Sequence, residues 1–319
     1  MLAPLSYLTG RIAGAKRGRI NQRRRDNQQK DAPPDPIVIV IGNLVAGGAG
    51  KTPLTIALAA YLQKKSYRVG LICRGGPAGA TNAVSLNSEP AENLDAGQIG
   101  DEARLLARAT GLPVVIGHQR DKALSELTNQ EPQLDIVISD DGLQHEPLRR
   151  DLELVVLDRR GLGNGRLLPA GPLREPASRL SQVDFLVANG GAWPGATTMH
   201  LVPGDLVRLR DGETLDAAAF RERYGAVHGV AGIGNPERFF RTLALLGLAV
   251  TPHAFADHHG FTAADLDFAD GRPVIMTEKD AVKCRDFDDP RLWMLPVHAN
   301  LPPATLDAMI DRALQSQPQ

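Results

Sequence analysis

The stretch Ile37 to Thr52, IVIVIGNLVAGGAGKT, decides the fold of this chain. Its apolar, β-branched first half predicts a buried strand, and its glycine-rich second half predicts a tight loop that leads into a helix. We expect this helix to begin at Lys51 and to continue through Leu54 to Gln63. A strand, a glycine-rich loop and a helix in this order are typical of a phosphate-binding loop.

The residue types of this loop suit the phosphates of a nucleoside triphosphate. Glycines permit positive φ and let backbone N–H groups approach phosphate oxygens, and the helix N-terminus adds a partial positive charge. Lys51 adds a full charge, and the Thr52 hydroxyl can bind Mg²⁺. Because the strict pattern would place glycine at Val45, this is a variant loop, and a glycine-rich turn with an ordinary exposed lysine is the alternative. The expected nucleotide-binding residues are Gly47, Gly48, Ala49, Gly50, Lys51, Thr52 and Pro53.

Length and composition favour a soluble α/β protein of two domains. The chain has 319 residues, 43% hydrophobic and 4% aromatic, which is long for one core. Its two cysteines, Cys73 and Cys284, are far apart and predict neither a disulfide framework nor a metal site, as fits a reducing cytoplasm.

The first 30 residues differ in charge from the rest of the chain. They carry eight Lys and Arg against one acid, Asp26, whereas the whole chain has a net charge of −1. Leu2, Leu5, Leu8 and Ile12 recur at helical spacing ahead of the basic run. We therefore predict that residues 1–30 form a basic amphipathic arm on an anionic membrane surface, since no apolar stretch is long enough to span a bilayer. A solvated basic arm is the alternative; nucleic acid is not expected as a partner, because no aromatics accompany the charges.

Two adjacent carboxylates follow an apolar strand at Leu134 to His145, LDIVISDDGLQH. Ligands of open α/β sheets bind outside the carboxyl ends of the strands. Mg²⁺ at such a site requires hard oxygen ligands near the phosphates. We therefore expect Asp140 and Asp141, together with Thr52, to form the metal site.

The segment after the strand Leu152 to Asp158 is rich in Gly, Pro and Arg and shows little periodicity. Five arginines make it cationic, which suits an anionic substrate, although solvated surface arginines are the alternative. A bidentate arginine suits a phosphate, and neutral or acidic polar groups suit sugar hydroxyls. The candidate acceptor-binding residues are Arg120, Gln144, His145, Arg174 and Glu175.

The pattern of strands and helices predicts the domain boundaries. A parallel sheet of the P-loop NTPase type, flanked by helices, is expected over residues 31–200. A two-stranded linker follows at 201–215, and a smaller α/β domain at 216–319, where the alternation of strands and helices restarts.

Seven ordered motifs resemble the tetraacyldisaccharide 4'-kinases of lipid A biosynthesis. They lie between about residues 36 and 298 and read GNLVAGGAGKTP, GDEARLLAR, ISDDGLQH, RLLPAGPLREP, GIGNPERFF, FADHH and TEKDAVK. The resemblance implies transfer of the ATP γ-phosphate, with Mg²⁺, to the 4'-hydroxyl of a tetraacyl glucosamine disaccharide 1-phosphate, which forms lipid IVA. It also implies a peripheral protein, expected to be a monomer, at the cytoplasmic face of the bacterial inner membrane.

Catalysis by this family would need a group that accepts the proton of the sugar hydroxyl. Asp101 lies early in an expected helix, and a carboxylate tuned by an imidazole would be a better base than one in water. The resemblance assigns an Asp and a His at these motifs to a catalytic pair, so Asp101 and His258, with Lys51, are the expected catalytic residues. The alternatives are a helix-terminal acid and a solvated loop histidine.

Three other functions are the alternatives to a kinase. Partitioning-type P-loop ATPases carry a lysine before the glycine pair, where this chain has Ala46. A GTPase would carry lysine second in its guanine-reading motif, whereas Thr277 to Asp280, TEKD, has it third. A membrane adaptor without a lipid acceptor remains, and it would show no turnover when acceptor lipid is added.

Overall fold

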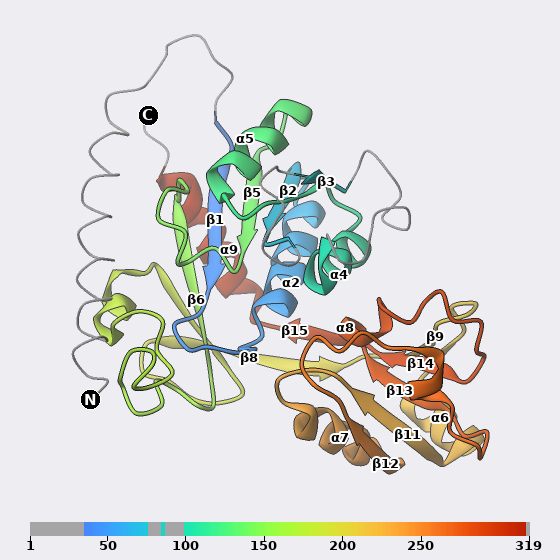
Figure 1. The fold of residues 1–319 in the computed structure, drawn as a ribbon. Coiled ribbons are helices and arrows are strands. Elements are labelled where there is room, and N and C mark those ends of the chain that lie inside the picture. Colours follow the sequence, from blue (N-terminus) through green and yellow to red (C-terminus); the bar gives the residue numbers. More distant parts are fainter. Residues whose placement is uncertain (1–34, 76–83, 87–98, 317–319) are drawn as a thin grey trace. The chain divides into compact units, whose positions relative to one another are not determined.

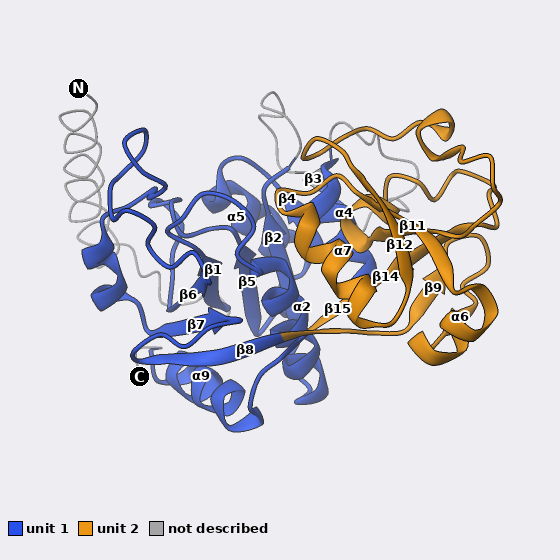
Figure 2. Ribbon diagram, turned by 90° about the horizontal axis from the view of Figure 1, so that it is seen from below, with its two compact units in different colours: residues 1–200, 299–319 blue, residues 201–298 orange. Residues whose placement is uncertain are grey.

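The computed structural model describes residues 35–75, 84–86 and 99–316 of the chain (Figure 1). The chain divides into two compact units, the first Met1–His200 with Ala299–Gln319 and the second Leu201–His298 (Figure 2). The predicted arm at residues 1–30 lies outside the described residues. Among those that are described, no helix is both long and apolar enough to cross a bilayer.

The first unit is built on a nine-stranded sheet, counted within the described residues, in the order β15-β8-β7-β6-β1-β5-β2-β4-β3. Strands β4, β2, β5, β1, β6, β7 and β8 pair in parallel, and only β3 is known to run antiparallel to its neighbour. The strands are β1 (Ile37–Gly42), β2 (Val69–Cys73), β3 (Val84–Ser85), β4 (Val114–Ile116), β5 (Ile136–Asp140), β6 (Leu152–Asp158), β7 (Phe185–Asn189), β8 (Ala196–Pro203) and β15 (Val297–Asn300).

Helices bury this sheet on both faces. Val38 and Val40 of β1 share a core cluster with Ala123 and Leu127 of α5, and the alternate residues of β1 are also fully buried. Because side chains alternate along a strand, β1 is covered on both sides, as parallel sheets require. The expected parallel P-loop sheet is confirmed. The helices are α2 (Lys51–Lys64), α4 (Asp101–Thr110), α5 (Arg120–Gln130) and α9 (Pro303–Gln315), with a 3-10 turn η1 (Ala177–Gln182).

The second unit contains a smaller sheet in the order β10-β9-β14-β13-β11-β12. Its core surrounds Trp293, whose ring lies 5.0 Å from that of Phe220 in an edge-on arrangement. The strands are β9 (Leu206–Arg208), β10 (Thr214–Leu215), β11 (Ala226–Ala231), β12 (Ala249–Ala254), β13 (Val274–Thr277) and β14 (Leu292–Leu295). The helices are α6 (Ala217–Tyr224), α7 (Pro236–Leu245) and α8 (Glu278–Ala281), with a 3-10 turn η2 (Ala263–Leu266).

The units differ from the predicted domains at two places. The expected linker at 201–215 is not separate, because β9 pairs with β14 and β10 pairs with β9 in the second sheet. The closing helix α9 was expected in the C-terminal domain but belongs to the first unit, where it packs against β1 and β6. Its apolar face, which includes Met309 and Ile310, is buried there. Order along the chain therefore did not determine which core the last helix joins.

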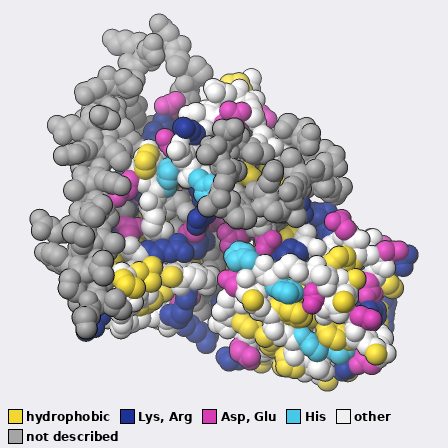
Figure 3. Space-filling model, viewed as in Figure 1, with side chains coloured by type: hydrophobic (Ala, Val, Ile, Leu, Met, Phe, Trp, Pro, Cys, Tyr) yellow, Lys and Arg dark blue, Asp and Glu magenta, His cyan; other side chains and the backbone are white. Residues whose placement is uncertain are grey.

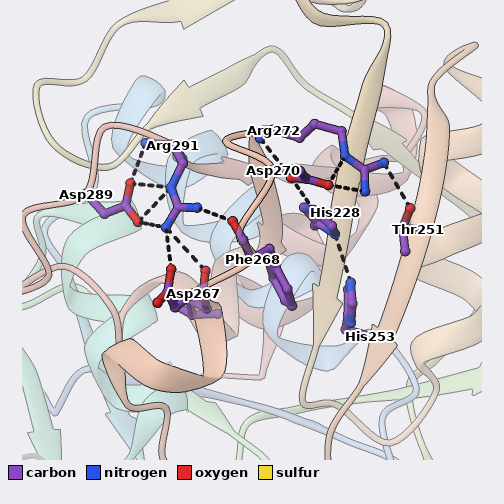
Figure 4. Close-up of polar contacts among 10 residues, drawn as sticks. His228, Thr251, His253, Asp267, Phe268, Asp270, Arg272, Asp289 and Arg291 are labelled. Atoms are coloured by element: carbon purple, nitrogen blue, oxygen red, sulfur yellow. Dashed lines mark hydrogen bonds and ion pairs between the residues drawn. The ribbon is translucent and has the colours of Figure 1, made fainter.

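A polar cluster connects the neighbouring strands β11 and β12 of the second unit to the loop before β13 (Figure 4). The His228 imidazole contacts the Asp270 carboxylate at 3.0 Å and the His253 ring nitrogen at 2.9 Å. Arg272 donates to Asp270 at 2.6 Å and to the Thr251 hydroxyl at 3.1 Å. Burial lowers the pKa of His253, and the neighbouring His228 adds to the effect. Because these groups satisfy one another, we interpret the cluster as structural.

Candidate active site

The phosphate loop joins β1 to α2 in the geometry that its glycines predict. Gly47 has φ 100° and Gly50, the residue that caps α2, has φ 98°, a region that side chains rarely adopt. A Cβ atom at Gly50 would also lie 2.5 Å from the Asn189 amide nitrogen. That amide donates to the Ala49 carbonyl at 2.8 Å, so the end of β7 braces the loop.

The Asn43 side chain holds the loop through three hydrogen bonds. Its amide nitrogen donates to the carbonyls of Val45 at 2.5 Å and Gly47 at 3.1 Å, and its amide oxygen accepts from Lys51 Nζ at 3.2 Å. The side chain is 1% exposed. Neither Asn43 nor Asn189 is among the residues that the sequence predicts for this site. Each is a polar residue at or just after the carboxyl end of an apolar strand, which is the signal that could have identified them.

Thr52 and Asp140 lie together, as predicted for a magnesium site. The Thr52 hydroxyl donates to Asp140 Oδ2 at 2.9 Å, and the Thr55 hydroxyl donates to Oδ1 at 2.9 Å. Asp140 ends β5 and is 2% exposed, and burial raises its pKa to about 6, with Glu102 adding and Lys51 opposing. Asp140 is a buried carboxylate without enough positive charge around it, and it lies beside the Thr52 hydroxyl. Two such oxygen ligands suit a divalent cation.

Asp141 has a different environment from its neighbour. It lies 3.4 Å from Lys51 Nζ and 3.4 Å from an Arg174 nitrogen. Burial alone would raise its pKa, but the two cations outweigh burial and the pKa is lowered. Asp141 is therefore ionised and orients the lysine and the arginine. A bound cation would stabilise the ionised form of Asp140, whose pKa is raised.

Three of the predicted acceptor-binding residues form one network. Arg174 donates to Gln144 Oε1 at 3.2 Å, and Gln144 Nε2 donates to Glu175 Oε1 at 2.9 Å and to the Asn43 carbonyl at 3.1 Å. Over the connection between β6 and β7, whose basic residues are all arginines, basic side chains gather beside hydrophobic ones (Figure 3). The network therefore joins the phosphate loop to a cationic surface.

The other two candidates, Arg120 and His145, form a second group beside Asp140. Arg120 is 3% exposed, and its guanidinium donates to the carbonyls of Gly117 and, at 3.5 Å, Asp140. The Arg120 backbone N–H donates to His145 Nε2 at 2.9 Å. Burial lowers the pKa of His145, and the Asp121 carboxylate, 3.2 Å from Nε2, opposes this shift.

Two arginines of the cationic segment pair with carboxylates of the protein itself. Arg179 is 5% exposed and pairs with Glu153, and with Glu175 at 3.6 Å. Arg160 pairs with Asp158 at 2.7 Å and donates to the Ala46 carbonyl at 2.9 Å. These two arginines hold the segment in place.

The two residues of the expected catalytic pair belong to different units and are described separately. Asp101 is the first residue of α4, where its charge also suits the helix N-terminus. His258 has φ 64°, and its Nε2 lies 3.3 Å from Lys279 Nζ. The pairing of Asp101 with His258 stays a prediction.

Comparisons with known proteins point to one family. The family described as tetraacyldisaccharide-1-P 4'-kinase matches residues 1–315. A tetraacyldisaccharide 4'-kinase of Alcanivorax borkumensis is 49% identical over 98% of this chain and 94% of its own length. One from Dechloromonas aromatica is 47% identical over 86% of this chain and 83% of its own.

A solved structure supports the same assignment. The crystal structure of LpxK from Aquifex aeolicus in complex with ATP superposes with a TM-score of 0.77 at 27% identity, and covers 98% of both chains. The match over the whole chain and the arrangement of the phosphate loop lead to one conclusion. The chain belongs to the tetraacyldisaccharide 4'-kinase family and is an ATP-dependent kinase with the P-loop fold.

Proposed function

We propose that this chain transfers the γ-phosphate of ATP to the 4'-hydroxyl of a tetraacyl glucosamine disaccharide 1-phosphate, which forms lipid IVA. The observation that carries the proposal is the continuous network from Lys51 through Asp141 and Arg174 to Gln144. It joins a phosphate loop to cationic and polar groups that suit a phosphorylated sugar.

The nucleotide would be held by the loop residues Gly47 to Pro53. Lys51 would place its charge against the transferred phosphoryl group, and Thr52 and Asp140 would hold Mg²⁺, with Asp141 orienting the lysine. When bound, the metal ion neutralises charge on the phosphate oxygens. Asn43 and Asn189 would keep the loop in shape for both ligands.

The acceptor would be bound by the two groups described beside the carboxylates. Arg174 is partly exposed and suits a phosphate, and Gln144 is exposed and suits sugar hydroxyls, with Glu175 orienting Gln144. His145 would complete the site, and Arg120, which is buried, would act in it by holding the Asp140 carbonyl and the His145 ring.

Asp101 would accept the proton of the sugar hydroxyl, and His258 would act with it. Such a base contributes about 100- to 10,000-fold to the rate. The arm at residues 1–30 would hold the protein peripherally on the anionic cytoplasmic face of the inner membrane, where a lipid acceptor is presented. We propose a monomer, with no nucleic acid partner.

The decisive experiment is transfer of labelled γ-phosphate from ATP to a panel of lipid A precursors, with and without Mg²⁺. We expect labelled product only with the 4'-hydroxyl precursor, ATP and Mg²⁺ together. Lys51→Ala should lower kcat by about 100- to 1,000-fold, since it removes a charge opposite the developing negative charge. Hydrolysis of ATP without transfer to any precursor would instead support an ATPase switch, and wild-type transfer by Lys51→Ala would refute the assignment of the phosphate loop.

A further inference from the structure

The carbonyl groups of the phosphate loop are turned toward donors of the protein itself. Phosphate oxygens are acceptors as well, so a carbonyl that faced the nucleotide would repel it, whereas a backbone N–H would bind it. The engaged carbonyls are those of Leu44, Val45, Ala46, Gly47 and Ala49, and their donors are the Arg174 backbone N–H and the side chains of Asn43, Arg160 and Asn189. These contacts keep the carbonyls of the loop away from a bound phosphate.

Asn43 holds two of these carbonyls at once. It is buried just after β1, and its amide nitrogen uses both of its hydrogens, one on the Val45 carbonyl at 2.5 Å and one on the Gly47 carbonyl at 3.1 Å. Its amide oxygen accepts from Lys51 Nζ at 3.2 Å. Turning the amide over would set its oxygen against two carbonyl oxygens and its nitrogen against an ammonium group, so the amide has one favourable orientation.

The backbone of Asn43 is held by residues outside the loop. Its carbonyl accepts from Gln144 Nε2 at 3.1 Å. A Cβ atom at the preceding residue, Gly42, would lie 2.3 Å from Leu143 Cβ, so the end of β1 lies tightly against the residues that follow β5. Asn43 is therefore a fixed point to which the loop is attached.

The peptide between Gly47 and Gly48 depends most on this attachment. Both residues are exposed, and glycine accepts negative and positive φ alike, so sterics alone do not decide which way this peptide faces. The C=O and N–H of a planar trans peptide point in opposite directions. The bond from Asn43 to the Gly47 carbonyl therefore turns the Gly48 N–H outward, to a side where a Cβ atom at Gly48 would meet nothing within 4 Å.

A flip of this peptide would exchange the two groups and present a carbonyl in place of the N–H. Such a flip reverses the sign of φ at the second residue of the peptide, as between turns of types I and II. Gly48, unlike Gly47 with φ 100°, is not in the positive-φ region. The flip would take it there, which glycine tolerates and alanine does not favour. A substitution at position 48 can therefore oppose the flip.

We propose that Asn43 is a positioning residue for phosphoryl transfer, which locks the peptide between Gly47 and Gly48 with its N–H toward the nucleotide phosphates. The inference rests on the proposed role of the phosphate loop in binding ATP. Asn43 acts through the loop, because it is buried beneath the peptides that it holds. In Asn43→Ala the Gly47 carbonyl is released, and the flipped peptide opposes a bound phosphate.

The crystal structure of Asn43→Ala without nucleotide tests the peptide directly. We expect the Gly47 carbonyl to leave its wild-type direction and turn outward. This readout does not depend on catalysis. A Gly47 carbonyl that keeps its direction in Asn43→Ala would overturn the proposal.

Calorimetric titration with ADP and Mg²⁺ provides the second readout, in a cycle of wild type, Asn43→Ala, Gly48→Ala and the double variant. Asn43→Ala should raise the Kd for ADP by about 10-fold or more, as when a hydrogen bond to a charged group is lost. In the Gly48→Ala background the same change should raise Kd by less than about threefold, because the added methyl group resists the flip. Equal factors in the two backgrounds would mean that Asn43 supports the fold or Lys51 alone, and would overturn the proposal.

Two further proteins guard against a loss of folding. Asn43→Ser retains one hydroxyl hydrogen and should raise the Kd for ADP less than Asn43→Ala does. Asn164→Ala is the matched control, because Asn164 also joins two backbone groups of a loop in the same unit. Its amide donates to the Ala170 carbonyl at 3.1 Å and accepts from the Arg166 N–H at 3.1 Å. Asn164→Ala should leave the Kd for ADP unchanged.

Two outcomes separate this inference from the proposed function. The expected Kd values in a protein that transfers no phosphate to any precursor would support the role of Asn43 and refute the proposed function. ADP binding and phosphate transfer at wild-type levels in Asn43→Ala would refute the role of Asn43 and leave the proposed function intact.

Discussion

Asp140, the proposed metal ligand, lowers the stability of the folded protein at neutral pH. Its pKa is raised to about 6 from 3.8, chiefly by burial, so the folded state holds the proton more tightly than the unfolded state. Stability is therefore lost as pH rises through the window from about 4 to 6, and above it the ionised carboxylate costs about 3 kcal/mol at 1.36 kcal/mol for each pKa unit. Asp140→Asn, free of Mg²⁺ and nucleotide, should be more stable than wild type at pH 7.5 by up to about this amount.

Denaturant unfolding at several pH values checks the Asp140 prediction. The advantage of Asp140→Asn should shrink toward pH 4. Asp135→Asn is the control for which we expect the opposite change in stability. Arg68 lowers the pKa of Asp135, so loss of the Asp135 carboxylate should destabilise the protein. If Asp140→Asn and wild type were equally stable across the whole pH range, ionised Asp140 would not be destabilised by its burial.

Arg174 allows a test of acceptor binding at the same scale. Arg174→Ala should raise KM for the lipid acceptor by about 10-fold or more, the size of a lost hydrogen bond to a charged group, while KM for ATP stays within about twofold. Steady-state kinetics with each substrate varied in turn measures this. Arg166→Ala, an exposed arginine of the same segment, should change neither constant. A defect confined to ATP would place Arg174 at the nucleotide instead.

At the scale of elements, the buried ion pairs of η1 hold the cationic segment against the sheet. Arg179 in η1 pairs with Glu153 of β6, which is 7% exposed and also pairs with Arg150 at 2.7 Å. Removing one partner leaves a buried charge short of compensation, so Arg179→Met should destabilise the protein by about 3 kcal/mol. Thermal or urea unfolding checks this against Arg166→Met. A change below about 0.5 kcal/mol, as for a surface substitution, would mean that η1 does not depend on the pair.

At the scale of the whole molecule, the proposed catalytic pair requires both units. Asp101→Ala and His258→Ala should each lower kcat by about 100-fold or more and leave ATP affinity nearly intact. The double variant should lose far less than the product of the two effects, because residues that act as one unit are not additive. Single-turnover transfer by the four proteins completes the cycle. Fully multiplicative losses would show that Asp101 and His258 act independently.

The basic arm provides the second test at this scale. Deleting residues 1–25 removes seven Lys and Arg, and each basic group near an anionic leaflet contributes about 1 kcal/mol. The shortened protein should move from the membrane to the soluble fraction. Its rate should fall more on substrate in vesicles than on substrate dispersed in detergent. Unchanged sedimentation with anionic vesicles would point to an attachment surface elsewhere.

The sequence alone was sufficient for the features that depend on contiguous residues. The run from Ile37 to Thr52 predicted β1, the phosphate loop and α2, because strand periodicity, glycine conformation and phosphate chemistry all act over a few neighbouring positions. The strands ending at Asp140, Asp158 and Asn189 were recognisable for the same reason. The seven motifs led to the correct family.

Only the tertiary structure decided which polar residues share an environment. Arg174 and Arg179 look alike in the sequence, yet one joins the network around Asp141 and the other is buried against Glu153. The contact of Asn189 with Ala49 joins residues 140 positions apart, and α9 packs on β1 although a whole unit separates them in the chain. Such pairings follow from the packing of distant elements into a common core, and local sequence patterns carry no information about which distant partner will be buried beside a given side chain.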